Sequence, residues 1–440
     1  NIYTKDVIDE VFGISNIYES FLETLNDLVD SGEIKEFLPF AYDWRYSVHD
    51  VVVSGAMYEE GLRGLVDEVE RLADSSYSGQ VTVIGHSNGG LLAKDLALEL
   101  ERLEKTDLIN KIIFIGTPHL GTPKALATIL HGYDQQKVGG LLIDDATARE
   151  AMNNMPGAYG LLPSARYLAE SDIPVVNFGT GEIIDPLRLL FGNSINTETE
   201  YKDFLVGVDG RTNDSDDISS PYTANPALFA EAMDLHRNKL DQWEVPLGIE
   251  VFNLVGVGLP SIAALEYREV VENSQCSGTL LGEIVCDKVE RFIRPYAQLT
   301  VYGDETVTSL SAASVSGQDF YFNLDDYRSD NLSLARRDHA DFLEIDDVQS
   351  FILGLIYSTS SHSQYISSAL PDLATEYEVI SIDSPVRIIA EDSEGRRTGV
   401  RGEGLSTEVV EEIPGSFYFE VAGTKYLITP RTDDVVIHLG

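Results

Sequence analysis

The stretch Val81–Leu96, with the sequence VTVIGHSNGGLLAKDL, constrains the fold more than any other part of this chain. It begins with a run that favours a β-strand, Val81–Ile84, and a helical pattern of leucines and alanines follows within a few residues. Ser87 lies between the two. A strand that changes so quickly into a helix makes a sharp turn, which lifts the serine hydroxyl above the edge of a parallel sheet. The strained turn needs small neighbours, and Gly85 and Gly89 meet that need. The sequence therefore predicts a nucleophile at Ser87, and the alternative is an ordinary glycine-rich turn.

Ser87 needs two partners elsewhere in the chain, because a serine requires a base and the base requires an orienting carboxylate. On a sheet of this kind the chain order is serine, acid, histidine. Asp304 directly follows the strand-like run LTVYG, and His339 precedes the last helical run before residue 360. We predict that His339 is the base and that Asp304 orients it, although Gly-Asp is also common in plain turns. The backbone N–H of Asn88, at the start of the helix, is predicted to donate to the oxyanion.

The other histidines fit the role of base less well than His339. His86 is adjacent to Ser87 and cannot reach round to its hydroxyl. The remaining ones precede any acid on a late strand, or lie in the insertion, the linker or the terminal strands. Asp338 and Asp341 are too close to His339 in sequence to come from a separate strand end.

The chain up to about residue 360 reads as alternating helices and strands. The predicted elements are a helix over 17–33, a strand over 37–44, a helix near 55–73, the strand 81–85, a helix near 88–104, strands at 111–116, 249–258 and 298–307, and a helix over 347–358. This alternation predicts an α/β fold, with a mostly parallel sheet covered by helices on both faces. Between about 120 and 245 the pattern breaks, and we predict an inserted cap or lid over the sheet edge.

The last part of the chain has a different character. Residues 376–440 contain short strand-like runs separated by turn signals such as Asp392–Gly395, which predicts a small all-β domain. We therefore divide the chain into an α/β domain over 1–362, with its cap, and a β-sandwich-like domain over 363–440. Both ends of the sequence look cut, so we expect the β domain to be truncated.

The net charge of −42 over 440 residues limits the partners. Such an acidic surface repels phosphate backbones, so nucleic acid is an unsuitable partner. It also disfavours an anionic membrane surface, but not a zwitterionic or neutral lipid surface, which the cap is expected to contact peripherally. A solvated acidic surface fits a secreted protein and also fits life in a saline habitat.

Two cysteines, Cys276 and Cys286, are separated by a short glycine-containing loop. We predict a disulfide between them, against the alternative of two free thiols, and hence a secreted or cell-surface location. No apolar run is long enough to span a bilayer. The acidic segment 208–220 does not have the ligand spacing of an EF-hand, so we expect a solvated loop rather than a calcium site and predict no metal.

Several motifs, taken in order, resemble those of the lecithin:cholesterol acyltransferase family, a branch of the α/β-hydrolases. They are AYDWR (41–45), GHSNGG (85–90), GTPHLGTPKAL (116–126), MPGAYGLLPS (155–164), NLVGVG (253–258), GDETV (303–307) and DHADFL (338–343). The resemblance spans roughly residues 17–358. It implies an α/β-hydrolase fold, acyl-ester chemistry on lipids or related hydrophobic esters, and a triad of Ser87, Asp304 and His339. It also implies that the segment containing His119 and Leu120 forms a loop beside the pocket.

The sequence departs from the family pattern at two points. Family members carry a strand and a Pro-Gly-containing loop that donates the second oxyanion N–H, and this segment is absent from the sequence. The family commonly has glycine after the aspartate, where this chain has Glu305. Trp44 and Arg45 follow a predicted strand and fit a pocket wall, but a purely structural pair of Asp43 with Arg45 explains the motif equally well.

The sequence thus predicts a serine hydrolase that cleaves lipid-like carboxylic esters and needs no cofactor. Three alternatives remain open: an O-acyltransferase with the same triad, a non-catalytic surface or binding protein on a hydrolase scaffold, and a serine peptidase. Fold alone does not choose among these chemistries.

Overall fold

The structure is a computed structural model of the 440-residue chain. It describes residues 4, 10–11, 15–133, 145–213, 217–280, 283–331, 337–359, 363–373, 376–383, 386–402, 408–431 and 435–440. For residues 10–11, 15–16, 272–280 and 283–289 it describes the backbone alone.

A five-stranded sheet forms the centre of the molecule, with the strand order β13-β12-β9-β6-β5. The strands are β5 (Val81–His86), β6 (Ile109–Ile115), β9 (Glu250–Val257), β12 (Gln318–Asn323) and β13 (Ile366–Ser367). The first four run parallel and β13 is antiparallel to β12. Among the described strands, β5 lies at the edge of the sheet and pairs with β6 alone.

Helices cover both faces of this sheet, and successive residues of β6 show how. Ile113 and Ile115 belong to the core that contains α1 (Glu19–Asp30) and α14 (Asp346–Ile356). Ile112 and Phe114 point the other way, because side chains alternate along a strand, and pack with α3 (Leu65–Ser75) and α4 (Asn88–Arg102). All four side chains are fully buried, which explains why β6 is a continuous apolar run.

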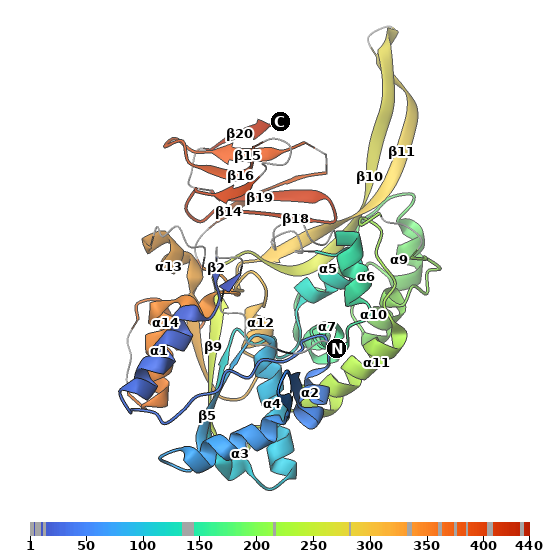
Figure 1. The fold of residues 1–440 in the computed structure, drawn as a ribbon. Coiled ribbons are helices and arrows are strands. Elements are labelled where there is room, and N and C mark those ends of the chain that lie inside the picture. Colours follow the sequence, from blue (N-terminus) through green and yellow to red (C-terminus); the bar gives the residue numbers. More distant parts are fainter. Residues whose placement is uncertain are drawn as a thin grey trace.

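The segment between β6 and β9 folds as a group of short helices beside the sheet (Figure 1). They are α5 (Pro123–His131), α6 (Asp145–Met152), α7 (Pro156–Tyr159), α8 (Ala165–Glu170), α9 (Asp185–Phe191), α10 (Glu198–Leu205) and α11 (Pro226–Leu235), which continues into a π-helical turn, His236–Leu240. Two short strands, β7 (Val176–Phe178) and β8 (Ser194–Ile195), lie among them.

A long β-hairpin follows β9 and stands out from the body of the molecule in Figure 1. Its strands, β10 (Ser261–Leu280) and β11 (Glu283–Thr300), join β7 and β8 in a second sheet with the order β11-β10-β7-β8. After β11 the chain returns to the central sheet through α12 (Ser309–Ala312), and α13 (Leu324–Asp330) follows β12.

The C-terminal part consists of two antiparallel sheets. One has the order β14-β19-β18, with β14 (Tyr377–Ile382), β18 (Phe417–Val421) and β19 (Thr424–Pro430). The other has the order β17-β16-β15-β20, with β15 (Ile388–Glu391), β16 (Arg397–Arg401), β17 (Glu408–Glu411) and β20 (Val436–Leu439). Ile388, Ala390, Tyr418 and Leu427 form a buried core shared by the two sheets. The predicted fold class, a mostly parallel sheet with helices followed by antiparallel β-structure, is confirmed.

Three predicted elements differ from the structure. Residues 37–44 form an extended run but no strand, because no strand within the described ranges pairs with them. The helix predicted near 55–73 is preceded by a small hairpin, β3 (Ala56–Tyr58) and β4 (Gly61–Arg63), after the short helix α2 (Val48–Ser54). Gly55 allows this turn, because its φ of +76° favours glycine and a Cβ there would lie 2.4 Å from the carbonyl oxygen of Arg63.

The third difference concerns the strand predicted at 298–307. Only residues up to Thr300 are in a strand, and that strand is β11 of the projecting hairpin rather than a member of the central sheet. The rest of the hairpin was not predicted, because its charged residues mask the alternation that indicates a strand.

Candidate active site

Ser87 lies at the tight turn between β5 and α4. Its backbone has φ +52° and ψ −127°, a sparsely populated conformation for a residue with a side chain, which costs about 1–3 kcal/mol and persists only where the surroundings impose it. The Ser87 N–H donates to the carbonyl of Ile115, which ties the turn to the end of β6. The turn therefore projects the hydroxyl above the carboxyl end of the sheet.

Of the two glycines predicted to be required by crowding at this turn, Gly85 is confirmed and Gly89 is not. A Cβ on Gly85 would lie 2.7 Å from the Cα of Gly90, and a Cβ on Gly90 would lie 2.0 Å from Oγ1 of Thr117. A Cβ on Gly89 would meet no atom within 4 Å. The prediction that Gly89 is required by crowding is therefore wrong, and the close approach involves Gly85 and Gly90. The reason is that α4 packs against β5 and the loop after β6 through Gly90.

Asp304 and His339 form a hydrogen-bonded array with Ser87. Nδ1 of His339 lies 2.7 Å from Oδ2 of Asp304, and Nε2 of His339 lies 2.8 Å from Oγ of Ser87. Asp304 is almost fully buried, and its other oxygen accepts hydrogen bonds from the backbone N–H groups of Thr306 (3.1 Å) and Val307 (2.7 Å). Both oxygens of Asp304 are thus held, which fixes the carboxylate relative to the imidazole.

Three neighbouring parallel strands bring this array together, since β5, β6 and β9 all end at it. Gly116 follows β6 with φ +53°, and a Cβ there would lie 3.0 Å from Oδ2 of Asp304 and 3.2 Å from Nδ1 of His339. A Cβ on Gly256 of β9 would lie 2.7 Å from Cβ of Asp304. The array therefore occupies the crevice at the carboxyl ends of the strands, where open α/β sheets place their ligands.

The turn that carries Asp304 contains a residue in the left-handed region. Glu305 has φ +80°, a conformation that glycine adopts without steric cost. Its backbone N–H donates to Oγ of Ser261 at 2.8 Å, which holds the turn against the start of β10. The turn conformation is one that suits glycine, and it is reached here with a glutamate.

The loop that carries His339 is fixed by its own acidic residues. The Asp338 N–H donates to Oδ1 of Asp341 (2.8 Å), and Arg337 contacts the other oxygen of Asp341 (3.1 Å). Burial, together with the charge of Asp338, raises the pKa of Asp341 to about 7. Asp338 and Asp341 thus shape the loop, and neither contacts the imidazole of His339 in place of Asp304.

Asn88 is the first residue of α4. The first N–H groups of a helix have no helical carbonyl to bond, and they attract negative charge. The backbone N–H of Asn88 lies next to Ser87 at this helix start, and its role as an oxyanion donor stays a prediction.

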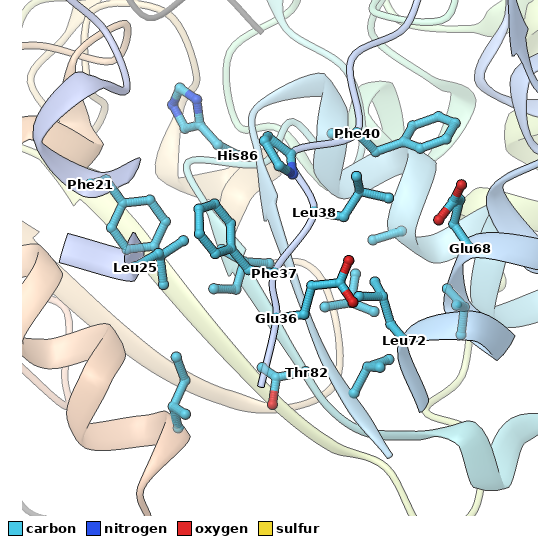
Figure 2. Close-up of a pocket in the computed structure, with 18 of the residues that line it drawn as sticks. Phe21, Leu25, Glu36, Phe37, Leu38, Phe40, Glu68, Leu72, Thr82 and His86 are labelled. Carbon is cyan, nitrogen blue, oxygen red and sulfur yellow. The ribbon is translucent and has the colours of Figure 1, made fainter. Parts of the chain in front are cut away.

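A cavity of about 880 Å³ lies along the unpaired edge of β5 and reaches Ser87 and His339. Figure 2 shows apolar side chains, among them Phe21, Phe37 and Leu38, gathered beside this strand. The opposite wall is the extended run 34–42, of which residues 35–40 make no backbone-to-backbone hydrogen bond with any described residue. Unpaired strand edges are uncommon in protein interiors, because buried N–H and C=O groups need partners.

Of the four residues predicted to contact substrate, one lines the cavity and the other three do not. Trp44 is 46% exposed and lines the cavity. Arg45 pairs with Asp43 through two hydrogen bonds of 2.8 and 2.5 Å, as in the purely structural interpretation. His119 and Leu120 are fully buried, and neither lines the cavity.

The site contains a further contact that no sequence motif indicates. His86, at the end of β5, contacts the backbone carbonyl of His339, and Tyr18, directly before α1, contacts His86. Because Tyr18 and His86 are 68 residues apart and lie in unrelated motifs, only the folded chain brings them together.

The two cysteines lie near the tip of the projecting hairpin, where the structure describes the backbone alone. The strand register places Cys276 directly opposite Cys286. Their side chains lie outside the described residues, so the disulfide stays a prediction.

The structure also bears on metals and membranes. Within the described residues, no group of three His, Cys, Asp or Glu side chains is arranged to hold a metal ion. In the segment 208–220, Asp209 pairs with Arg211, Asp217 accepts a hydrogen bond from Ser219, and residues 214–216 lie outside the described part. None of the described helices combines the length and the apolar character needed to cross a membrane.

The fold and the site together define an α/β-hydrolase. The sheet is mostly parallel, a group of helices is inserted, a serine lies at the turn after a strand of that sheet, and an acid and a histidine lie at the strand ends. The model of the lecithin:cholesterol acyltransferase family matches residues 7–318. This chain belongs to that family.

Comparison with other proteins adds little beyond the family. No curated protein sequence matches the chain. A chain in the crystal structure of the Tle4–Tli4 complex is similar over 70% of this chain and 65% of its own length, with 13% identity and a TM-score of 0.40. The propeptide form of the Bacillus licheniformis lipase BlEst2 is similar over 85% of this chain and 62% of its own length, with 13% identity and a TM-score of 0.23. The chain thus spans less than two thirds of either protein.

Proposed function

We propose that this protein is a serine hydrolase that cleaves lipid-like carboxylic esters through an acyl-enzyme. The observation that carries the proposal is the array in which His339 lies 2.8 Å from Oγ of Ser87 and 2.7 Å from Asp304, at the carboxyl ends of three parallel strands. Family membership supports the acyl-ester chemistry and the lipid class of substrate.

The geometry supports the following steps. Nε2 of His339 takes the hydroxyl proton of Ser87 as Oγ attacks the ester carbonyl, and the N–H of Asn88 donates to the oxyanion. Asp304 holds the Nδ1 proton of His339 and stabilises the imidazolium. His339 then gives its proton to the leaving alkoxide, which departs as the alcohol and leaves an acyl-Ser87 ester. A water molecule, deprotonated by His339, releases the carboxylic acid and restores Ser87. These steps use groups of the protein and water, and they are proposed to need no cofactor.

The second oxyanion donor is proposed to come from an extended segment paired with the open edge of β5. In this fold class that donor belongs to the loop after the strand beside the nucleophile strand. The cavity beside β5 lies where such a strand would be, between β5 and the extended run 34–42, and it reaches Ser87. We therefore do not assign the whole cavity to substrate.

Acyl transfer to an alcohol is the second candidate function. The family takes its name from an acyltransferase, and the same acyl-enzyme would serve both hydrolysis and acyl transfer. The two differ in whether water or an alcohol reaches the acyl-Ser87 ester first. Product analysis with a long-chain alcohol added to the assay separates them.

A secreted or cell-surface location and contact with a neutral lipid surface are further proposals. The facing positions of Cys276 and Cys286 support the location, since disulfides persist in oxidising compartments.

On the inserted segment, Leu189 and Leu190 of α9 are 89% and 50% exposed, which suits a peripheral lipid contact. Flotation with vesicles of zwitterionic lipid, wild type beside a double variant Leu189→Asp/Leu190→Asp, tests that contact.

The decisive experiment for the function is hydrolysis of p-nitrophenyl esters of increasing chain length, with Ser87→Ala as the control. We expect wild-type turnover and a loss of about 10⁶-fold in kcat for Ser87→Ala. A fluorophosphonate probe, which labels an activated serine without depending on acyl preference, is applied to the same samples. If wild type neither hydrolyses any ester nor takes up the probe, the proposal is wrong and the non-catalytic scaffold is favoured.

A further inference from the structure

We propose that His86 and Tyr18 position the catalytic base, by holding the backbone carbonyl and the ring of His339 in the orientation that reaches Ser87. This inference rests on the proposed function, because it assigns a role relative to His339 as base. Neither residue contacts the reacting atoms, so both are positioning residues.

The contact between His86 and the base loop fixes the protonation of His86. Nε2 of His86 lies 2.8 Å from the backbone carbonyl oxygen of His339. A carbonyl oxygen only accepts, so Nε2 of His86 carries the proton. Nδ1 of the neutral ring is then an acceptor, and the hydroxyl of Tyr18 lies 2.8 Å from it. The hydrogen bonds therefore run from Tyr18 to His86 and from His86 to the carbonyl of His339.

The two rings also pack on each other. The ring centroids of His86 and His339 are 5.1 Å apart with an interplanar angle of 35°, and Tyr18 meets the ring of His86 edge-on at 5.6 Å. Burial and the neighbouring imidazole of His339 lower the pKa of His86 to about 3, and burial raises the pKa of Tyr18 to about 12. Both groups thus keep their hydrogen-bonding roles over the pH range in which an imidazole base works.

These contacts complete the restraint on His339. Its backbone N–H donates to the carbonyl of Asp304 at 3.1 Å, and its backbone carbonyl accepts from His86. The main chain of the base is therefore held from both sides, one side by the acid and the other by the residue adjacent to the nucleophile. Because His86 and Ser87 are consecutive, this hydrogen bond ties the position of the base to that of the nucleophile. A base displaced by about 1 Å can lose on the order of 100-fold in rate.

The test compares fluorophosphonate inactivation of wild type, His86→Leu, His86→Asn and His86→Gln. The amide nitrogen of glutamine reaches the place of Nε2 and can still donate to the carbonyl of His339, whereas asparagine is too short. We expect His86→Leu and His86→Asn to lower the limiting inactivation rate constant about 10- to 100-fold, with the half-saturating probe concentration unchanged. We expect His86→Gln to stay within about threefold of wild type.

Tyr18→Phe adds a second, independent comparison. Removing one hydrogen bond to Nδ1 of His86 is expected to slow inactivation about threefold in wild type. In the His86→Leu background the same change is expected to have no effect, because the acceptor is gone and the two residues act as one unit.

His131 provides a matched control. It is a buried histidine that also lies between a carbonyl, that of Ile218 (2.6 Å), and a tyrosine hydroxyl, that of Tyr267 (2.8 Å), and it does not line the cavity beside β5. Like the His86 variants, His131→Gln and His131→Leu alter a buried histidine that contacts a carbonyl and a tyrosine hydroxyl. They are expected to lower the melting temperature while leaving the inactivation rate constant unchanged.

The inference is overturned if folded His86→Leu or His86→Asn reacts at the wild-type rate, if His86→Gln is as slow as His86→Asn, or if the His131 variants slow the reaction equally. Failure of the proposed function has a different signature. In that case wild type itself takes up no probe, or Ser87→Ala is labelled as well as wild type, and both proposals fall together.

Discussion

The backbone N–H of His339 donates a hydrogen bond to the backbone carbonyl of Asp304 at 3.1 Å, in addition to the 2.7 Å contact between their side chains. The two residues are 35 positions apart in sequence. The main-chain contact holds the imidazole near the carboxylate whatever the charge of that carboxylate, so charge and position can be tested separately.

Asp304→Asn is expected to leave the fold intact and to lower kcat about 10⁴-fold, because asparagine keeps the shape but favours the wrong tautomer of His339. Steady-state ester hydrolysis and the melting temperature measure the two effects. Asp319→Asn is the control, since Asp319 is a carboxylate of β12 that pairs with Asn253 and not with His339. Retention of more than about a tenth of the wild-type kcat by Asp304→Asn would contradict the role assigned to Asp304.

Gly89→Ala and Gly90→Ala are expected to have opposite effects on stability. Gly89 has open space where a Cβ would be, so alanine there gains helix propensity of up to about 1 kcal/mol in α4. At Gly90 the Cβ would overlap the side chain of buried Thr117, which costs about 1–3 kcal/mol. Urea unfolding of both variants measures the difference. Equal destabilisation by the two changes would show that the space beside Gly89 is filled in solution.

Lys94→Met is expected to stabilise the protein, most strongly at neutral and acid pH. Lys94 of α4 is 3% exposed and its ammonium lies 5.8 Å from the ring of Trp243. Burial lowers the pKa of Lys94 from 10.5 to about 7. Below pH 7 the folded state carries a buried charge and its full cost, between pH 7 and 10.5 the cost decreases, and above 10.5 the lysine is neutral in both states.

The gain in the free energy of unfolding is therefore expected to be on the order of a few kcal/mol at pH 6 and to approach that of a neutral substitution near pH 10.5. Denaturant unfolding of wild type and Lys94→Met across this range checks the sign. Lys202→Met, at an exposed position of α10, is the control and is expected to show no such trend. A gain for Lys94→Met that grows with rising pH would refute the argument.

The open edge of β5 gives a prediction for hydrogen exchange. The amides of β5 that point away from β6 pair with no strand that the structure describes, whereas β6 pairs on both sides. In the 440-residue chain we expect about half of the amides over 81–86 to exchange faster than those over 111–115. Mass spectrometry of peptides from the two strands makes the comparison. Equal protection of the two strands would mean that the edge is already paired in solution.

The strand register at the tip of the hairpin predicts a disulfide that chemical analysis can detect. Facing residues on antiparallel strands have Cα atoms about 4.5–5.5 Å apart, within the range that a disulfide spans. Alkylation of the denatured protein is expected to modify Cys276 and Cys286 only after reduction. Modification of both thiols without a reductant, in protein purified from an oxidising compartment, would count against the bridge and against the proposed location.

Sequence reasoning went furthest where a short pattern contains its own physical cause. The run from Val81 into the helix after Ser87 has a strand signal, a turn and a helix signal within a few residues, so it indicated the position of the serine directly. The placement of Asp304 after a strand-like run and of His339 before a helix followed from chain order. The structure brings the three side chains into contact, and their catalytic roles remain to be tested.

Other features depend on contacts between distant segments. Whether residues 37–44 form a strand depends on a partner strand, which their own sequence does not contain. The need for glycine at Gly90 rather than at Gly89 depends on Thr117, which approaches through the packing of the loop after β6 on α4.

Local propensity and periodicity act over a few residues, and they were enough to indicate the strand-turn-helix at Ser87, the α/β class and the change to β-structure near the C-terminus. The unpaired edge of β5, the long hairpin and the hydrogen bonds from Tyr18 through His86 to His339 were settled only by tertiary structure. The reason is that strand pairs and side-chain contacts form between residues far apart in the sequence. A local sequence pattern does not show where its distant partner will lie in the folded chain.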